Sequence, residues 1–200
     1  MGMRGALIWG APPDDRPYSS KKYDPFWAAA AGLNMPLSLH ILTSRRGHGI
    51  DFSKILRSYM SLPQEIQITL ADMVYGGVFE RHPKLKIVSA ENDVSWLPHF
   101  MYRLDHGYDR LRHFGNVQLS MMPSEYIKRQ VWATFQFEDV WIDTYKRFDM
   151  SKIMWSSDYP HTDSPWPRSK EYIAEHFSLA PEDVLAKVVG GNAAELYGIQ

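Results

Sequence analysis

Five short apolar segments alternate with stretches of helical character along this chain, and that alternation constrains its fold more than any other feature. The segments lie at 5–9, 36–41, 85–91, 131–135 and 152–156. Strands that are each followed by a helix over short connections pair in parallel, through right-handed crossovers. The sequence therefore predicts an α/β fold, either an open five-stranded parallel sheet or part of an eight-stranded β/α barrel.

Three of the apolar segments end in a side chain that can bind a metal ion: His40, Glu91 and Asp158. Because ligands bind at the carboxyl ends of parallel strands, we expect these three side chains to face one cavity. Imidazole together with carboxylates suits a divalent metal, with zinc preferred and manganese or iron as alternatives. The competing interpretation is a structural histidine, with Asp158 in an ordinary turn.

Basic residues near these strand ends are candidates for binding an anionic substrate. Arg103, in the helical stretch after Glu91, could grip a carboxylate through two parallel hydrogen bonds, or could form a surface ion pair with Asp105 or Asp109. The loop 45–50 carries two arginines and a histidine, and is either an anion-binding loop or a solvated surface loop.

The bulk properties narrow the class of partner. Its 200 residues are 44% hydrophobic and 14% aromatic, enough for one core, so we expect a single domain over residues 1–200. The net charge of −1 and the scattered cationic residues are not typical of nucleic-acid binding, which leaves a small molecule as the expected partner.

The absence of cysteine excludes disulfides and thiolate ligands. No segment is long and apolar enough for a signal or a membrane span, and we expect a cytoplasmic protein.

The helical stretches carry recognisable boundaries. Asp24 is expected to cap a helix that ends at Gly32, and a long helical segment that opens near Pro63 should run to Arg81. The stretch 138–148 has the apolar spacing of one amphipathic helix.

Four segments, taken in order, resemble the amidohydrolase-related family, in the branch that includes aminocarboxymuconate semialdehyde decarboxylase. They are Pro-Leu-Ser-Leu-His at 36–40, the passage Gly-Gly-Val-Phe-Glu-Arg-His-Pro-Lys-Leu-Lys at 76–86, Trp-Ser-Ser-Asp-Tyr-Pro-His at 155–161 and Gly-Asn-Ala-Ala-Glu-Leu-Tyr at 191–197. The first resembles the fifth strand of the family's barrel with its metal histidine, here His40. The third is similar to the eighth-strand motif, whose aspartate, here Asp158, binds metal and transfers a proton.

The resemblance implies that the chain is the C-terminal portion of a TIM-like (β/α)8 barrel, about strands 4 to 8. It also implies metal-dependent hydrolysis of a C–N or lactone bond, or non-oxidative decarboxylation, of a small carboxylate-bearing or cyclic substrate. By the same resemblance Arg103 and His161 contact the substrate, and Glu91 stands where many relatives have a histidine. The family's first three strands supply a further pair of ligands. Weak metal binding and little or no activity are therefore expected from these 200 residues alone, and both should be restored when a segment bearing those strands is supplied.

A non-catalytic protein is the alternative: an inactive, truncated half-barrel or an interaction module. In either case the segment 5–9 should present an unpaired strand edge or an apolar flank, because its outer neighbour would come from elsewhere. We therefore expect a homo-oligomer, or pairing with an N-terminal half through this edge.

Overall fold

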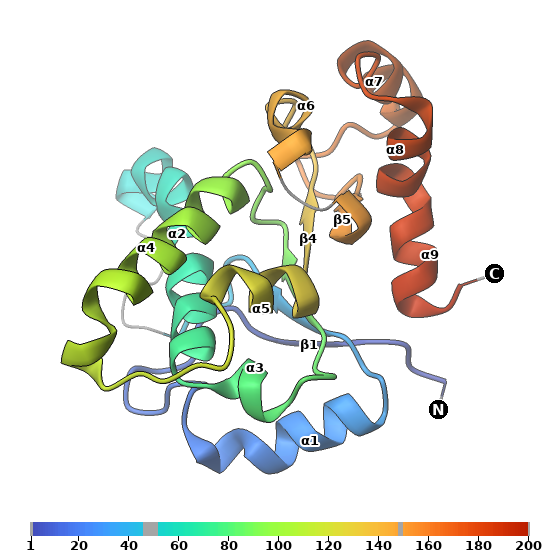
Figure 1. Cartoon of the computed structure of the whole chain (residues 1–200). Coiled ribbons are helices and arrows are strands. Elements are labelled where there is room, and N and C mark those ends of the chain that lie inside the picture. Colours follow the sequence, from blue (N-terminus) through green and yellow to red (C-terminus); the bar gives the residue numbers. More distant parts are fainter. Residues whose placement is uncertain (1, 46–51, 148–149, 200) are drawn as a thin grey trace.

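One sheet of five parallel strands organises the computed structural model, which describes residues 2–45, 52–147 and 150–199. The strands are β1 (Ala6–Trp9), β2 (Leu37–His40), β3 (Ile87–Ala90), β4 (Val131–Phe135) and β5 (Ile153–Trp155). All four neighbouring pairs are parallel and follow the order of the chain (Figure 1). The predicted parallel α/β sheet is confirmed.

The order of the strands separates the two architectures that the sequence left open. A doubly wound sheet reverses its strand order at a switch point, whereas a β/α barrel adds each new strand beside the previous one. Here the order is β1-β2-β3-β4-β5, without a reversal. The sheet therefore winds as a barrel does, and it is open, since within the described residues β1 and β5 each have one neighbouring strand.

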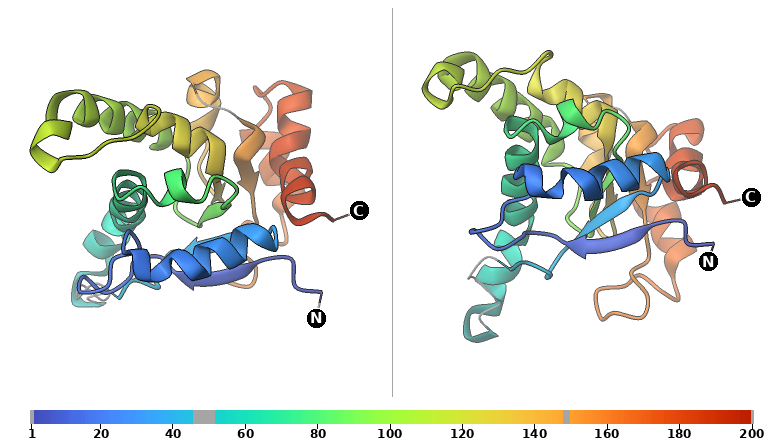
Figure 2. Two further views of the ribbon diagram at one scale, coloured as in Figure 1. Left: turned by 60° about the horizontal axis from the view of Figure 1, so that its bottom comes forward. Right: turned by 90° about the horizontal axis from the view of Figure 1, so that it is seen from below.

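Helices flank the sheet on two sides. They are α1 (Asp24–Gly32), α2 (Ile55–Tyr75), α3 (Val78–Arg81), α4 (Leu97–Gly115), α5 (Pro123–Gln130), α6 (Trp141–Thr144), α7 (Ser169–His176), α8 (Glu182–Ala186) and α9 (Asn192–Tyr197). Figure 2 shows the C-terminal helices (red) beside β5, on the other side of the molecule from α4 (green). Within the described residues, no helix is long and apolar enough to cross a membrane.

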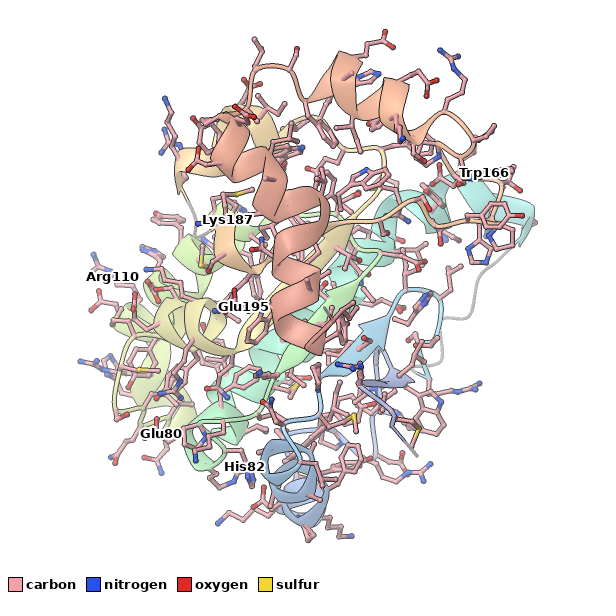
Figure 3. The ribbon with its side chains drawn as sticks, turned by 90° about the vertical axis from the view of Figure 1, so that its right-hand side faces the viewer. Glu80, His82, Arg110, Trp166, Lys187 and Glu195 are labelled. Atoms are coloured by element: carbon pink, nitrogen blue, oxygen red, sulfur yellow. The ribbon has the colours of Figure 1, made fainter. Side chains whose placement is uncertain are left out.

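The two faces of the sheet bury different side chains, because side chains alternate along each strand. One face carries Leu39, Ile87 and Ile153 into the main core, beneath the helices that connect the strands. The opposite face carries Val88 and Met154, among others, into a smaller apolar cluster with Leu196 of α9. The C-terminal helix therefore covers part of this second face, and Figure 3 shows it in front of the strands.

Asn192 fixes the position of the C-terminal helix. Its side-chain Nδ2 donates to the carbonyl oxygens of Met150 and Ile153, at 2.6 and 2.7 Å. Because the Asn192 side chain is buried and donates two hydrogen bonds to the backbone around the start of β5, it ties α9 to the sheet.

The predicted helix boundaries were partly wrong. Asp24 is the first residue of α1 and its side chain binds Arg81 and His82, so it does not act as an N-cap. The helix α2 is continuous through Pro63, since the buried side chains of its second half hold it against the core. The stretch 138–148 forms only the short α6 and a 3-10 turn. In α6 only Trp141 is buried, so little apolar surface holds a longer helix there. Phe148 lies outside the described residues.

A charged cluster joins α1 to the segment between α3 and β3. The guanidinium of Arg81 donates to both carboxylate oxygens of Asp24 at 3.0 to 3.1 Å, and His82 Nε2 lies 3.1 Å from Asp24 Oδ1. Figure 3 shows His82 close to α1. Partial burial alone would raise the pKa of Asp24, but the hydrogen bonds and charges of Arg81 and His82 together lower it.

Asp24→Ala is expected to reduce the free energy of unfolding by about 2 kcal/mol at pH 7, because it removes charge-assisted hydrogen bonds. The folded-state pKa of Asp24 is depressed, so this contribution is present above its ordinary value of 3.8 and is lost as pH falls through the lower folded value. Urea unfolding at pH 7 and pH 3 should show the difference between wild type and variant shrinking at the lower pH. Asp15→Ala, which removes an exposed carboxylate, is the control and should change little. An equal difference at both pH values would contradict the assignment.

The outer side of β1 shows the predicted apolar flank. Leu7 and Trp9 are 58% and 40% exposed, and the pairing partner of β1 within the described residues is β2 alone. Association through this edge stays a prediction.

Candidate metal centre and active site

The carboxyl ends of β2, β3 and β5 bring three of the predicted site residues to one place. His40 ends β2, Glu91 follows β3, and Asp158 lies three residues after β5. The ring nitrogen Nε2 of His40 lies 2.9 Å from Glu91 Oε1, and His161 Nδ1 lies 2.8 Å from Asp158 Oδ1. Ligand atoms of Glu91, Asp158 and His161 all lie within 4.8 Å of one another. The structure therefore brings the three predicted side chains close together with His161, although of the three only Glu91 lines the neighbouring cavity. Their roles as metal ligands stay predictions.

Unusual backbone conformations hold the carboxylates of this cluster. Glu91, Asp93 and Asp158 have φ angles of 62°, 58° and 52°, in the left-handed region. This conformation costs residues with a Cβ roughly 1–2 kcal/mol each, and such strained residues concentrate at functional sites. The Glu91 turn is held by a 2.8 Å hydrogen bond from its backbone N–H to Thr134 Oγ1 on β4.

The imidazole of His40 faces an oxygen atom at each ring nitrogen. Nδ1 lies 2.7 Å from the carbonyl oxygen of Ile41, and Nε2 faces Glu91. Of the two ring nitrogens, Nδ1 is thus turned to a backbone carbonyl and Nε2 to the carboxylate. A histidine that donates one nitrogen to a carbonyl group and turns the other toward the site has the arrangement of a metal ligand.

Electrostatics in the cluster reflect its crowded carboxylates. Burial, and to a smaller degree the charge of Asp158, raise the pKa of Glu91, while His40 opposes the shift. The hydrogen bond and the charge of Asp158 raise the pKa of His161. Two carboxylates and one imidazole, those of Glu91, Asp158 and His161, converge within 4.8 Å, and His40 borders this group through its contact with Glu91. Such donors fit a divalent cation. The structure thus supplies a fourth donor, His161, beyond the three expected from the sequence.

A cavity of about 350 Å³ opens beside the cluster, with Glu91 in its wall. Its other lining residues are Ile41, Tyr59, Pro63, Asp93, Gln136, Phe137, Glu138 and Asp163. This volume suits a small organic molecule. Burial and the charges of Glu138 and Asp163 raise the pKa of Asp93 to about 6.

Arg103 lies apart from this cluster. It is exposed on α4. Its charge acts on the hydroxyl of Tyr75, the last residue of α2, where it opposes the rise in the pKa of that hydroxyl. That end of α2 leads to the start of β3, whereas the cluster lies at the strand carboxyl ends. The guanidinium of Arg45 lies over the ring of Trp9, 5.0 Å from its centroid, and residues 46–51, with the predicted anion-binding arginine and histidine, lie outside the described residues.

Of the residues that line the cavity, sequence reasoning predicted Glu91 and missed the others, among them Tyr59, Asp93, Glu138 and Asp163. Asp93 could have been found by its place two residues after Glu91, in a segment that must turn away from the strand end. Tyr59 and Asp163 carry no such signal. They meet because the Tyr59 hydroxyl, on α2, donates to a carboxylate oxygen of Asp163, in the loop after β5.

Comparisons with known proteins agree with this architecture. Gamma-resorcylate decarboxylase from a Polaromonas species is 24% identical over 212 residues, which cover 98% of this chain and 62% of that protein. The crystal structure of 5-carboxyvanillate decarboxylase from Sphingomonas paucimobilis matches with a TM-score of 0.83 at 24% identity, over 99% of this chain and 59% of the other. A dihydroxybenzoic acid decarboxylase from Polaromonas, solved with bound manganese and the inhibitor 2-nitroresorcinol, matches with a TM-score of 0.76 at 21% identity, over 99% of this chain and 61% of the other.

The chain thus spans about three fifths of the length of these relatives. The likenesses confirm that its sheet corresponds to part of a TIM-like amidohydrolase barrel. A family model described as amidohydrolase matches residues 1–199. Since that match covers all but the last of its 200 residues, the chain belongs to the amidohydrolase family.

Proposed function

We propose that this chain carries the cation site and part of the substrate cavity of a divalent-metal-dependent decarboxylase that acts on a small aromatic carboxylate. The observation that carries the proposal is the cluster of His40, Glu91, Asp158 and His161 at the strand carboxyl ends. The family membership and the decarboxylases among the relatives support the reaction class.

Each residue of the cluster has a role in this proposal. Glu91, Asp158 and the two histidines would hold the ion, whose positive charge would bind the substrate carboxylate and stabilise negative charge that develops on the ring. In the reaction, the bond between the ring carbon and the carboxyl carbon breaks, carbon dioxide leaves, and its bonding electrons stay on the ring carbon. Asp158 would take up a proton from water and pass it to this carbon.

The choice of metal follows from the donor atoms. The sequence favoured zinc, with manganese or iron as alternatives. Carboxylate-rich sites suit manganese, and one structural relative was solved with manganese bound. We therefore propose manganese first and zinc second.

Two measurements on the whole chain test the proposal. Calorimetric titration with Mn²⁺ should show one weakly bound ion per chain. With a segment that carries the family's first strands supplied, the manganese-loaded protein should release carbon dioxide from 2,6-dihydroxybenzoate, and a chelator should stop the release. Binding of no divalent ion, or chelator-insensitive turnover, would contradict the proposed centre. Stoichiometric metal without turnover of any aromatic acid would favour the non-catalytic alternative.

A further inference from the structure

The walls of the cavity beside the proposed metal centre are of two chemical kinds. Tyr59 and Phe137 supply aromatic surface and Ile41 supplies apolar surface, as a flat ring requires. Four carboxylates share the same cavity: Glu91, Asp93, Glu138 and Asp163. Among the described residues that line it, none is a lysine, an arginine or a histidine.

Three of the four carboxylates already have partners. Glu91 binds His40, and Asp163 accepts the hydroxyl hydrogen of Tyr59. Glu138 accepts the backbone N–H groups of Val94 and Ser95, at 2.6 and 2.9 Å. These contacts fix where each of the three charges lies.

Asp93 is different from the other three. Its backbone carbonyl accepts the indole N–H of Trp96. Its side chain is exposed at the open side of the cavity, and within the described residues its carboxylate has no hydrogen-bond or ion-pair partner. The left-handed φ of 58° places this residue in a conformation that a side chain other than Asn or Asp adopts less readily. Asp93 is therefore the wall carboxylate that is available to a bound molecule.

Negative charge in a confined cavity selects ligands by charge, because a like charge brought beside it is repelled and an unpaired acceptor favours a donor. A divalent cation at the proposed centre would attract one substrate carboxylate at one end of the cavity. A second carboxylate on the same molecule would meet the negative charges of Asp93, Glu138 and Asp163 without a counter-charge among the described lining residues.

We infer that the substrate, beyond the carboxylate that binds the metal, carries hydrogen-bond donors such as ring hydroxyl or amino groups and no second carboxylate, and that Asp93 recognises those donors. This inference rests on the proposed function for the position of the first carboxylate. It separates two chemistries that occur among the relatives, since 2,6-dihydroxybenzoate is a monocarboxylate with ring hydroxyls and 5-carboxyvanillate is a dicarboxylate.

The test compares two ligands that differ in one ring substituent, 3-hydroxybenzoate and isophthalate (benzene-1,3-dicarboxylate). Their affinities for the manganese-loaded full chain are measured by calorimetry, at constant ionic strength. For wild type we expect 3-hydroxybenzoate to bind at least about tenfold more tightly than isophthalate. Repulsion between two like charges at short range can produce a difference of this size. For Asp93→Asn, which keeps a residue that tolerates the left-handed backbone, the ratio should fall below about threefold.

Asp109→Asn provides the matched control, because Asp109 is an exposed carboxylate on α4 and is not part of the cavity wall. This variant should keep the wild-type ratio. Isophthalate bound as tightly as 3-hydroxybenzoate by wild type, an unchanged ratio in Asp93→Asn, or no binding of either compound would each overturn the inference.

The outcomes also separate this inference from the proposed function. Selective binding of 3-hydroxybenzoate without decarboxylation of any aromatic acid would contradict the proposed reaction, but it would agree with the inferred selectivity of the cavity. Efficient decarboxylation of a dicarboxylate such as 5-carboxyvanillate would overturn the inference and leave the proposed reaction.

Discussion

Asp158→Asn is expected to reduce manganese-dependent turnover by about three orders of magnitude or more, while it changes the free energy of unfolding by less than about 1 kcal/mol. The amide has the size of the carboxylate, but it has no negative charge for the ion and cannot take up a proton and pass it to the substrate carbon. Packing should survive, because Asn also tolerates the left-handed φ of 52° that Asp158 adopts.

Two measurements on the Asp158→Asn variant separate a chemical effect from a structural one. Calorimetry should show weaker Mn²⁺ binding, and thermal unfolding should show a melting temperature close to that of wild type. Asp143→Asn, a carboxyl-to-amide change on α6 outside the cluster, is the control and should keep full turnover and metal affinity. If Asp158→Asn retains more than a tenth of wild-type turnover, the proton-transfer role of Asp158 is wrong.

Trp141→Ala is expected to be the most destabilising change, at about 3–5 kcal/mol, because it empties a fully buried aromatic site. Trp141, Phe135 and Phe177 are each 0% exposed, and their ring centroids lie 5.2 to 5.8 Å apart. This cluster joins the end of β4 to α6 and to the residue that follows α7. The cavity residues Gln136 to Glu138 begin directly after Phe135, so the loss should also loosen the cavity wall.

Trp141→Phe is the matched control for this prediction. The indole Nε1–H of Trp141 is buried and, within the described residues, has no hydrogen-bond partner, so its removal should cost no hydrogen bond. The smaller ring should therefore reduce the free energy of unfolding by only about 1–2 kcal/mol. Urea unfolding of the three proteins measures both changes. Equal losses for Ala and Phe would show that the hydrogen-bonding group matters more than the packing.

The sequence predicted the strands well because strand formation there depends on local pattern. Residues 37–40, 87–90 and 153–155 are short buried runs, and each lies inside a predicted segment. Helix boundaries were less predictable, because packing partners decide them. Asp24 has the chemistry of an N-cap, but Arg81, 57 residues away, binds its carboxylate.

Part of the candidate site could likewise be predicted from the sequence, and part depends on how the chain packs. His40, Glu91 and Asp158 could be found from the sequence, since the carboxyl ends of neighbouring parallel strands meet at one edge whatever the rest of the chain does. His161 also came from the sequence, as a substrate contact, and only the fold placed it beside Asp158 and Glu91. Arg103 met the chemical requirement for a carboxylate ligand, yet the packing of α4 places it near the end of α2.

The amino-acid sequence by itself determined the parallel strands, their polar ends and the resemblance to a metal-dependent family, because each of these features depends on residues that follow one another in the chain. The tertiary structure decided the sequential strand order, the acidic wall around Asp93 and the contact between Tyr59 and Asp163. These features join residues that are tens of positions apart, and the free energy that selects them comes from packing helices onto a sheet, which no single segment of the chain encodes.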